Sequence, residues 1–161
     1  MADNQKYKSP FEAGAYYHVF HHAVGNENLF REHDNYRYFL EKLNKHLDGY
    51  CELTDWCLMP NHFHLIVFVK TELAARFSME EINNKVIKCF ADFMNGYSKA
   101  MNKRYKRWGS IFAGRFRRIK IVDDRHLENT RNYLRTNPVH HGFANNPESW
   151  PHSSLITNTA A

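Results

Sequence analysis

The sequence lacks the features of secreted, membrane-spanning and disordered proteins. No apolar run approaches the ~20 residues that span a bilayer, and the first ten residues contain no hydrophobic signal-peptide core. Repeats and low-complexity stretches are absent, and a hydrophobic content of 43% argues against disorder. We therefore expect a cytoplasmic protein, with no membrane partner, whose residues 1–161 form a single domain with its own core.

Cysteine is scarce. The chain has three cysteines, an odd number, at Cys51, Cys57 and Cys89. They do not have the spacing of a ligand motif, and no two of them are suited to a disulfide. We expect reduced, buried thiols. A zinc site formed by Cys57, His62 and His64 is a weaker alternative, because a second CxxC or HxxxH pair is missing.

Acidic residues are absent from the segment 99–120, although the net charge of the chain is only +5. This concentration of positive charge is typical of a surface that binds a polyanion. Aromatic residues that could stack on unpaired bases are interleaved with the basic ones, namely Tyr105, Trp108, Phe112 and Phe116. The alternative is a salt-bridged helix end whose aromatic side chains belong to the core. The predicted nucleic-acid contacts are Arg104, Arg107, Arg115, Arg117, Arg118 and Lys120.

Hydrophobic periodicity predicts the element order β, α, β, β, α, β, α. Strands are expected at 16–23, 50–58, 62–69 and 115–122, and helices at 34–49, 78–104 and from Asp123 or Asp124 to Pro138. Asp34 should cap the first helix, Ser78 with Glu81 should form a capping box on the second, and Pro138 should stop the third. The tail from Gly142 should be irregular. This order indicates an α+β, ferredoxin-like (RRM-like) antiparallel sheet of four to five strands covered by helices, with an added C-terminal helix.

A pair of histidines opens the third predicted strand. Alternate residues of a strand share one face, so His62 and His64 lie about 6.5 to 7 Å apart on the same side and can reach one cation. On the last helix, Tyr133 and Asn137 are four residues apart and are neighbours on one helix face. Each residue also has a plain structural explanation: strand histidines are common, a helix tyrosine usually packs its ring, and Asn137 could simply end the helix.

Other histidines are weaker candidates. His18, His21 and His22 could contact nucleic acid or support the metal ligands, but surface positions on the first strand are expected. His126 lies seven residues before Tyr133, on roughly the same helix face, where it could assist proton transfer. A solvated position in the first helical turn is the expectation for this residue.

The motifs resemble those of the single-tyrosine HUH transposases, and most closely the REP-associated tyrosine transposase branch. The run from Cys57 to Leu65 (CLMPNHFHL) and the Tyr-x-x-x-Asn-Pro-Val element at 133–139 carry the resemblance, with supporting segments at 109–112 and 150–154. Two departures, His22-Ala23-Val24-Gly25 in place of an Arg-Gly pair and Leu-Arg-Thr after Tyr133, leave the recognised DNA sequence open.

The resemblance implies a metal-dependent enzyme that nicks and rejoins single-stranded DNA, often palindromic and hairpin-forming, through a covalent 5′-phosphotyrosine. By position, Tyr133 is the nucleophile and His62, His64 and Asn137 bind the divalent ion. Mg²⁺ or Mn²⁺ suits these ligands, and the mixed nitrogen and oxygen set favours Mn²⁺. The alternative function is a non-catalytic module that binds single-stranded nucleic acid on an RRM-like sheet. Either a monomer or a homodimer is compatible with the sequence.

Overall fold

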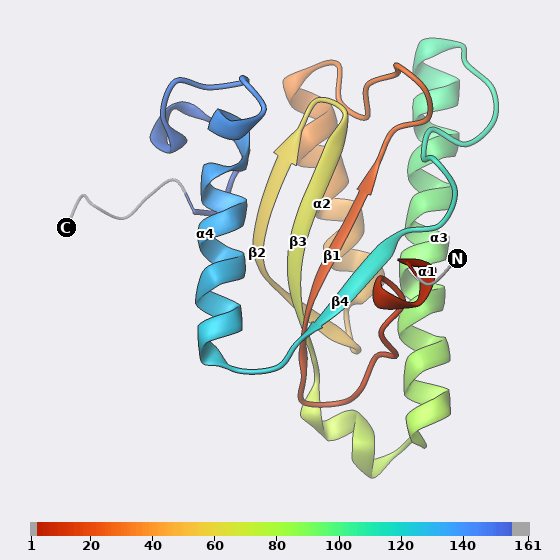
Figure 1. Cartoon of the computed structure of the whole chain (residues 1–161). Helices are drawn as coiled ribbons and strands as arrows, with labels where there is room; N and C mark the ends of the chain where they lie inside the picture. The colour runs from red at the N-terminus through yellow and green to blue at the C-terminus, as the bar shows by residue number, and fades with distance from the viewer. Residues whose placement is uncertain (1–2, 156–161) are drawn as a thin grey trace.

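The computed structural model describes residues 3–155 and shows a four-stranded antiparallel sheet with helices on both faces (Figure 1). The strand order is β2-β3-β1-β4, which is the ferredoxin-like order and confirms the predicted α+β class. The strands are β1 (Tyr16–His22), β2 (Cys51–Met59), β3 (His62–Val69) and β4 (Arg117–Ile121). The helices are α1 (Asp3–Lys6), α2 (His33–Leu47), α3 (Met79–Tyr105) and α4 (Asp124–His140), with 3-10 turns η1 (Thr71–Ala75) and η2 (Pro147–Ser149).

The two faces of the sheet have different roles. One face packs on α2 and α3 and forms the main core, to which β3 contributes Phe63, Leu65 and Val67. The opposite face carries His62, His64 and Ile66, and α4 covers part of it through Leu127 and Leu134. Because the side chains alternate along β3, the same strand supplies both the core and the histidine pair.

The predicted start of α3 is confirmed, whereas the predicted start of α2 needs a correction. Ser78 and Glu81 form the expected capping box at the start of α3. Asp34 does not cap α2, which begins one residue earlier, after Glu32. There the Asn35 side chain accepts a hydrogen bond from the Glu32 amide at 3.0 Å, so an asparagine inside the first turn does the work expected of a cap.

The end of the last helix also differs from the prediction. Asp123 caps α4 by accepting a hydrogen bond from the His126 amide at 2.7 Å, but Pro138 lies inside the helix, which continues to His140. Proline lacks one backbone donor, and here the loss falls in the last turn of the helix, where Pro138 is buried. The amide of His141 still donates to the Asn137 carbonyl, at 3.0 Å.

Both edges of the sheet are covered by chain termini. The segment 7–9 runs along β4, where the Arg118 amide donates to the Tyr7 carbonyl at 2.8 Å. The tail pairs with β2: the Leu58 amide donates to the His152 carbonyl at 2.8 Å, and the Ser154 amide donates to the Trp56 carbonyl at 2.9 Å. No described helix is both long enough and apolar enough to cross a membrane.

Candidate active site

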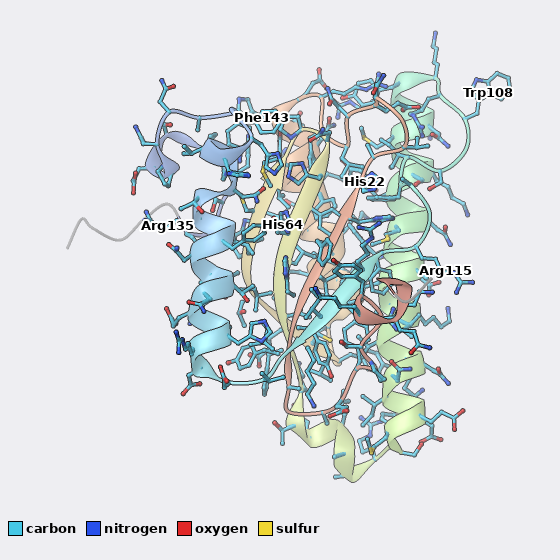
Figure 2. All side chains as sticks on the ribbon, in the orientation of Figure 1. His22, His64, Trp108, Arg115, Arg135 and Phe143 are labelled. Carbon is cyan, nitrogen blue, oxygen red and sulfur yellow. The ribbon has the colours of Figure 1, made fainter. Side chains whose placement is uncertain are left out.

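The structure brings the four predicted active-site residues together on the α4 side of the sheet. His62 Nε2 lies 3.1 Å from Asn137 Oδ1. The centres of the Tyr133 and His64 rings are 5.3 Å apart, at nearly a right angle. Figure 2 shows His64 on the sheet beside α4. These residues are far apart in sequence and meet within one chain because β3 lies beneath α4.

His62 stands between two amide oxygens. Its Nδ1 is 2.7 Å from Asn61 Oδ1, and its Nε2 faces Asn137 Oδ1. Burial lowers the pKa of His62, so the neutral ring has one proton and can donate to only one of these oxygens. If the proton is on Nδ1, the Nε2 lone pair faces the lone pairs of Asn137 Oδ1.

This contact fits a shared cation. Ligands that bind an ion at about 2.1 Å and at right angles are about 3.0 Å apart, close to the distance between His62 and Asn137. The amide nitrogen of Asn137 is buried without a hydrogen-bond partner among the described residues. A 180° turn of this amide, which would let its nitrogen donate to His62, is the other way to satisfy the pair.

His64 is held by a third histidine. His18 Nε2 and His64 Nδ1 are 2.8 Å apart, so one ring donates to the other. Burial lowers the pKa of His18 to about 4 and that of His64 well below its usual value, so both rings are neutral at pH 7, the form that binds metals. The expected surface position of His18 is wrong, since this residue is buried on the site face of β1.

Tyr133 is the accessible member of the group. Its side chain is 47% exposed, whereas Asn137, one turn further along α4, is 1% exposed. The Tyr133 ring borders an open pocket of about 390 Å³, together with His18, Phe20, His64 and Arg117. A substrate can therefore reach the phenol and the histidine pair from the same side.

The zinc alternative is not supported. No group of three or more His, Cys, Asp or Glu side chains within residues 3–155 is arranged to hold a metal ion. Cys57 is buried, its backbone pairs with Ser153, and burial raises the pKa of its thiol to about 12. All three cysteines are free and buried, as expected. The remaining candidate ligand set, His62, His64 and Asn137, contains an amide oxygen in place of a third histidine or an acid.

Only one of the predicted basic contacts faces the site. Arg117 pairs with Phe20 in the sheet and borders the Tyr133 pocket, whereas Arg118 and Lys120 point to the opposite face. Arg115 lies on the α3 side of the molecule (Figure 2). The role of these arginines and of Lys120 in binding nucleic acid stays a prediction.

Several basic side chains of the same set already have acidic partners. Arg107 pairs with Glu27 at 2.8 Å and its side chain is only 9% exposed. Arg104 pairs with Glu32 at 2.6 Å, and Lys120 with Glu12 at 2.5 Å. Any phosphate that contacts them must compete with these carboxylates.

The aromatic residues of segment 99–120 divide into two groups. Phe112 and Phe116 are buried in the core, as the structural alternative held, and Tyr105 donates to Glu32 at 2.6 Å. Trp108 is 90% exposed and projects from the loop that follows α3 (Figure 2). It is the member of the group that remains fully accessible to a base.

The remaining histidines differ in burial and in hydrogen-bond partners. His22 is exposed, as expected, but His21 is buried on the core side, 3.0 Å from the Gly114 carbonyl. His126 accepts a hydrogen bond from the Val122 amide at 3.2 Å and so helps to fix the start of α4. The contact of Asn61 with His62, at 2.7 Å, was not predicted, although the place of Asn61 in the motif is a usable signal.

Comparisons with known proteins show the family and the fold of the chain. The family model described as "Transposase IS200 like" matches residues 13–137. A curated relative from Haemophilus influenzae, which bears the name of a REP-associated tyrosine transposase, is 29% identical over 108 residues, or 65% of this chain and 59% of the relative. The chain thus matches little more than half the length of that protein.

A solved structure of a REP-associated tyrosine transposase, bound to a REP hairpin, has the same fold. Its TM-score is 0.69 at 17% identity, and the match covers 95% of this chain and 93% of that one. The family match includes β1 to β4 and most of α4, and therefore all four residues brought together here. The chain belongs to the IS200-like transposase family.

Proposed function

We propose that this protein nicks and rejoins single-stranded, hairpin-forming DNA through a covalent 5′-phosphotyrosine on Tyr133. The observation that supports this most strongly is the position of Tyr133, an exposed phenol beside His64, with Asn137 against His62 on the next helical turn. In this proposal His62, His64 and Asn137 hold Mg²⁺ or Mn²⁺. Such an ion supplies positive charge that offsets the charge of the scissile phosphate.

The residues of the chain have distinct roles in this reaction. The Tyr133 oxygen forms a bond to phosphorus as the bond from phosphorus to the 3′ oxygen breaks, which leaves a free 3′-hydroxyl. The phenol is open to solvent, so its proton passes to water and the leaving oxygen takes one from water. Attack of a 3′-hydroxyl on the phosphotyrosine reverses the step and rejoins the DNA without another energy source.

Substrate binding uses the open face of the sheet. Arg117 borders the Tyr133 pocket and can contact a phosphate there. Trp108 is exposed on the loop after α3, away from this pocket, and can stack only on a base that lies beyond it. The hairpin partner is proposed by analogy, because the related structure was solved with a REP hairpin. The recognised sequence is left open.

A labelled-DNA experiment tests the reaction. A synthetic hairpin with single-stranded flanks is incubated with Mn²⁺ and analysed on a denaturing gel. The label should travel with the protein when it is at the 3′ end of the DNA, and should leave on a shorter fragment when it is at the 5′ end. Tyr133→Phe, which keeps the ring, should form no adduct, and EDTA should prevent it.

The non-catalytic alternative gives a different result. A binding module would retain DNA in a salt-sensitive way, form no adduct and bind equally with chelator or with His62→Ala. Equal adduct formation by the wild type and Tyr133→Phe would show that the nucleophile is assigned wrongly. Binding of Mn²⁺ by the free protein, followed by the loss of its electron paramagnetic resonance signal, tests the ligand set without DNA.

A further inference from the structure

A second pocket lies on the opposite face of the β4 edge, between α3 and the segment 110–118. We call it the α3–β4 pocket. It encloses about 450 Å³, within the range of about 300–1,000 Å³ that is usual for small-molecule sites. Its helix side is formed by Ile87, Ala91, Met94 and Asn95. None of these residues belongs to the Tyr133 site.

The α3–β4 pocket is positively charged. Lys8, Arg115 and Arg118 line it, and within residues 3–155 no acidic side chain does. Arg118 is half-buried between the rings of Phe11 and Phe116, 5.2 and 5.3 Å from their centres. Its Nε donates to the Ser9 carbonyl at 2.9 Å, and no described carboxylate pairs with it.

The lack of a counter-ion has a physical consequence. Burial lowers the pKa of Arg118, which means that desolvation of this cation is unfavourable. An anion in the pocket would offset this cost, because a buried charge is stabilised by an opposite charge with hydrogen bonds. Arg115 and Lys8 are exposed and can bind the same anion.

The walls add an apolar surface to this charge. Met94, Phe112 and Phe116 are largely buried and expose only a small part of their surface to the pocket, while Asn95 and Ser110 offer polar atoms. An apolar and aromatic wall beside cations matches the chemistry of one unstacked nucleotide, which has a flat base and a phosphate. A free inorganic anion would use only the charged part.

The α3–β4 pocket adjoins the Tyr133 pocket across the thickness of the sheet edge. Tyr7 and Arg117 line the Tyr133 pocket, and their chain neighbours Lys8 and Arg118 line the α3–β4 pocket. A DNA strand that leaves the Tyr133 site past Arg117 therefore meets the second pocket when it bends around β4. The two sites can be filled by one strand.

We propose that the α3–β4 pocket binds a nucleotide of single-stranded DNA that flanks the scissile phosphate, with its phosphate on Lys8, Arg115 and Arg118 and its base against Met94 and the two phenylalanines. This assignment rests on the proposed function and deepens it. It gives the protein a second contact that fixes which phosphate reaches Tyr133.

Abasic scanning with a pocket-filling variant tests this assignment. The probe is a DNA hairpin with oligothymidine flanks, in which one flanking base at a time is removed, and binding to full-length protein is measured by fluorescence anisotropy. One flanking position should weaken wild-type binding about 5- to 100-fold, the range expected for loss of one stacked base. Ala91→Phe, which fills the pocket from α3, should bind the intact probe about as weakly and show no further loss at that position.

Two control variants are used: one adds the same ring outside the pocket, and the other removes the same charge elsewhere. Asn84→Phe places the same ring at an exposed position of α3 outside the pocket and should keep the wild-type profile. Arg115→Ala should weaken binding and reduce its salt dependence more than Lys45→Ala on α2, which removes the same charge elsewhere. Retention of the wild-type abasic profile by Ala91→Phe would overturn the proposal.

Other outcomes separate the possible ligands and the two proposals. Tight binding of thymidine monophosphate or inorganic phosphate at the pocket, with no sensitivity to abasic flanks, would assign it to a free anion and overturn the DNA contact. At saturating DNA, Ala91→Phe should still form the Tyr133 adduct, with a broader choice of cleavage position. If the wild type forms no adduct but shows the abasic profile, the catalytic proposal fails and the pocket assignment stands.

Discussion

The contact between His18 and His64 gives β1 a role in the proposed metal site. A histidine that binds a metal through one nitrogen is usually oriented by a hydrogen bond at the other, and loss of that partner typically lowers metal affinity 10- to 100-fold. His18 is placed to orient His64 in this way, at 2.8 Å. It acts through His64 and is a positioning residue.

Replacement of His18 should therefore weaken metal binding. We expect His18→Phe to raise the dissociation constant for Mn²⁺ about 10- to 100-fold, measured by electron paramagnetic resonance on the DNA-free protein. His46→Phe, on α2 at the opposite face of the sheet, is the matched control and should change it little. Equal affinity of the two variants would contradict the role of His18.

A buried histidine on the other face should make stability depend on pH. Burial lowers the pKa of His21 to about 4 from the ordinary 6.5, so between these values the unfolded chain binds the extra proton. Stability should fall as the pH drops from 6.5 to 4, by roughly 1 to 3 kcal/mol from this residue. His21→Gln, which can still donate to the Gly114 carbonyl, should flatten this decline in urea unfolding.

The pH range gives this prediction an internal control. Above pH 7 residue 21 should be uncharged in both proteins, so their free energies of unfolding should differ by a constant. An equally steep decline in both proteins below pH 6.5 would mean that other groups cause the acid sensitivity.

At the residue scale, local periodicity predicted the pairing of His62 with His64 and of Tyr133 with Asn137. Both relations depend only on strand and helix geometry. The partner of His18 could not be predicted, because the register between β1 and β3 is set by the folded sheet. The pairing of Arg118 with the segment 7–9 could not be predicted for a related reason, because its carbonyl and amide bond to residues that are distant in sequence.

The position of α4 decides whether Tyr133 and Asn137 reach the histidines. Besides its apolar contacts, α4 is joined to β2 by Arg131, whose Nε is 3.3 Å from the carboxylate of Asp55. Asp55 is buried and also accepts from the Thr54 hydroxyl at 2.8 Å. This ion pair fixes the first half of α4 to the sheet.

Loss of the arginine should loosen this connection. Arg131→Met leaves a buried carboxylate without its cation, and we expect it to lower the free energy of unfolding by about 1 to 3 kcal/mol and to reduce adduct formation. Removing both charges in Asp55→Leu/Arg131→Met should restore most of the stability, because no buried charge remains. A double variant less stable than Arg131→Met would refute this account of the pair.

At the element scale, the sequence predicted every main strand and helix but not all of their ends. Pro138 was expected to stop α4, yet the helix passes it because the cost of proline is small in a last turn that is held by tertiary packing. The start of α2 was placed late because Asn35 acts from inside the helix. In both cases contacts formed on folding outweigh the local preference.

Across the whole molecule, the chain termini protect the sheet. An open edge strand offers unpaired backbone groups to another chain, and here the segment 7–9 and the tail around Ser153 occupy both edges. The sequence predicted an irregular tail but gave no sign of this pairing, since the tail lacks the alternation of a strand.

Removal of the tail should therefore promote association. A chain that ends at Asn146 should form larger species than the full chain as concentration rises, measured by light scattering after size exclusion, because β2 loses its backbone partners. Trp150→Phe removes only the side-chain hydrogen bond to the Leu58 carbonyl and is the control. Unchanged mass over the same concentrations would argue that the tail does not shield β2.

Tyr133 and Asn137 both lie on α4, which has a consequence for the proposed reaction. Under the proposed function, an ion clamped by Asn137 would also anchor the helix that carries the phenol. Binding of the ion and orientation of the Tyr133 phenol would then be coupled. Without the ion, the phenol would be oriented less firmly for attack on the phosphorus. Such linkage would limit cleavage of DNA whenever the ion is missing.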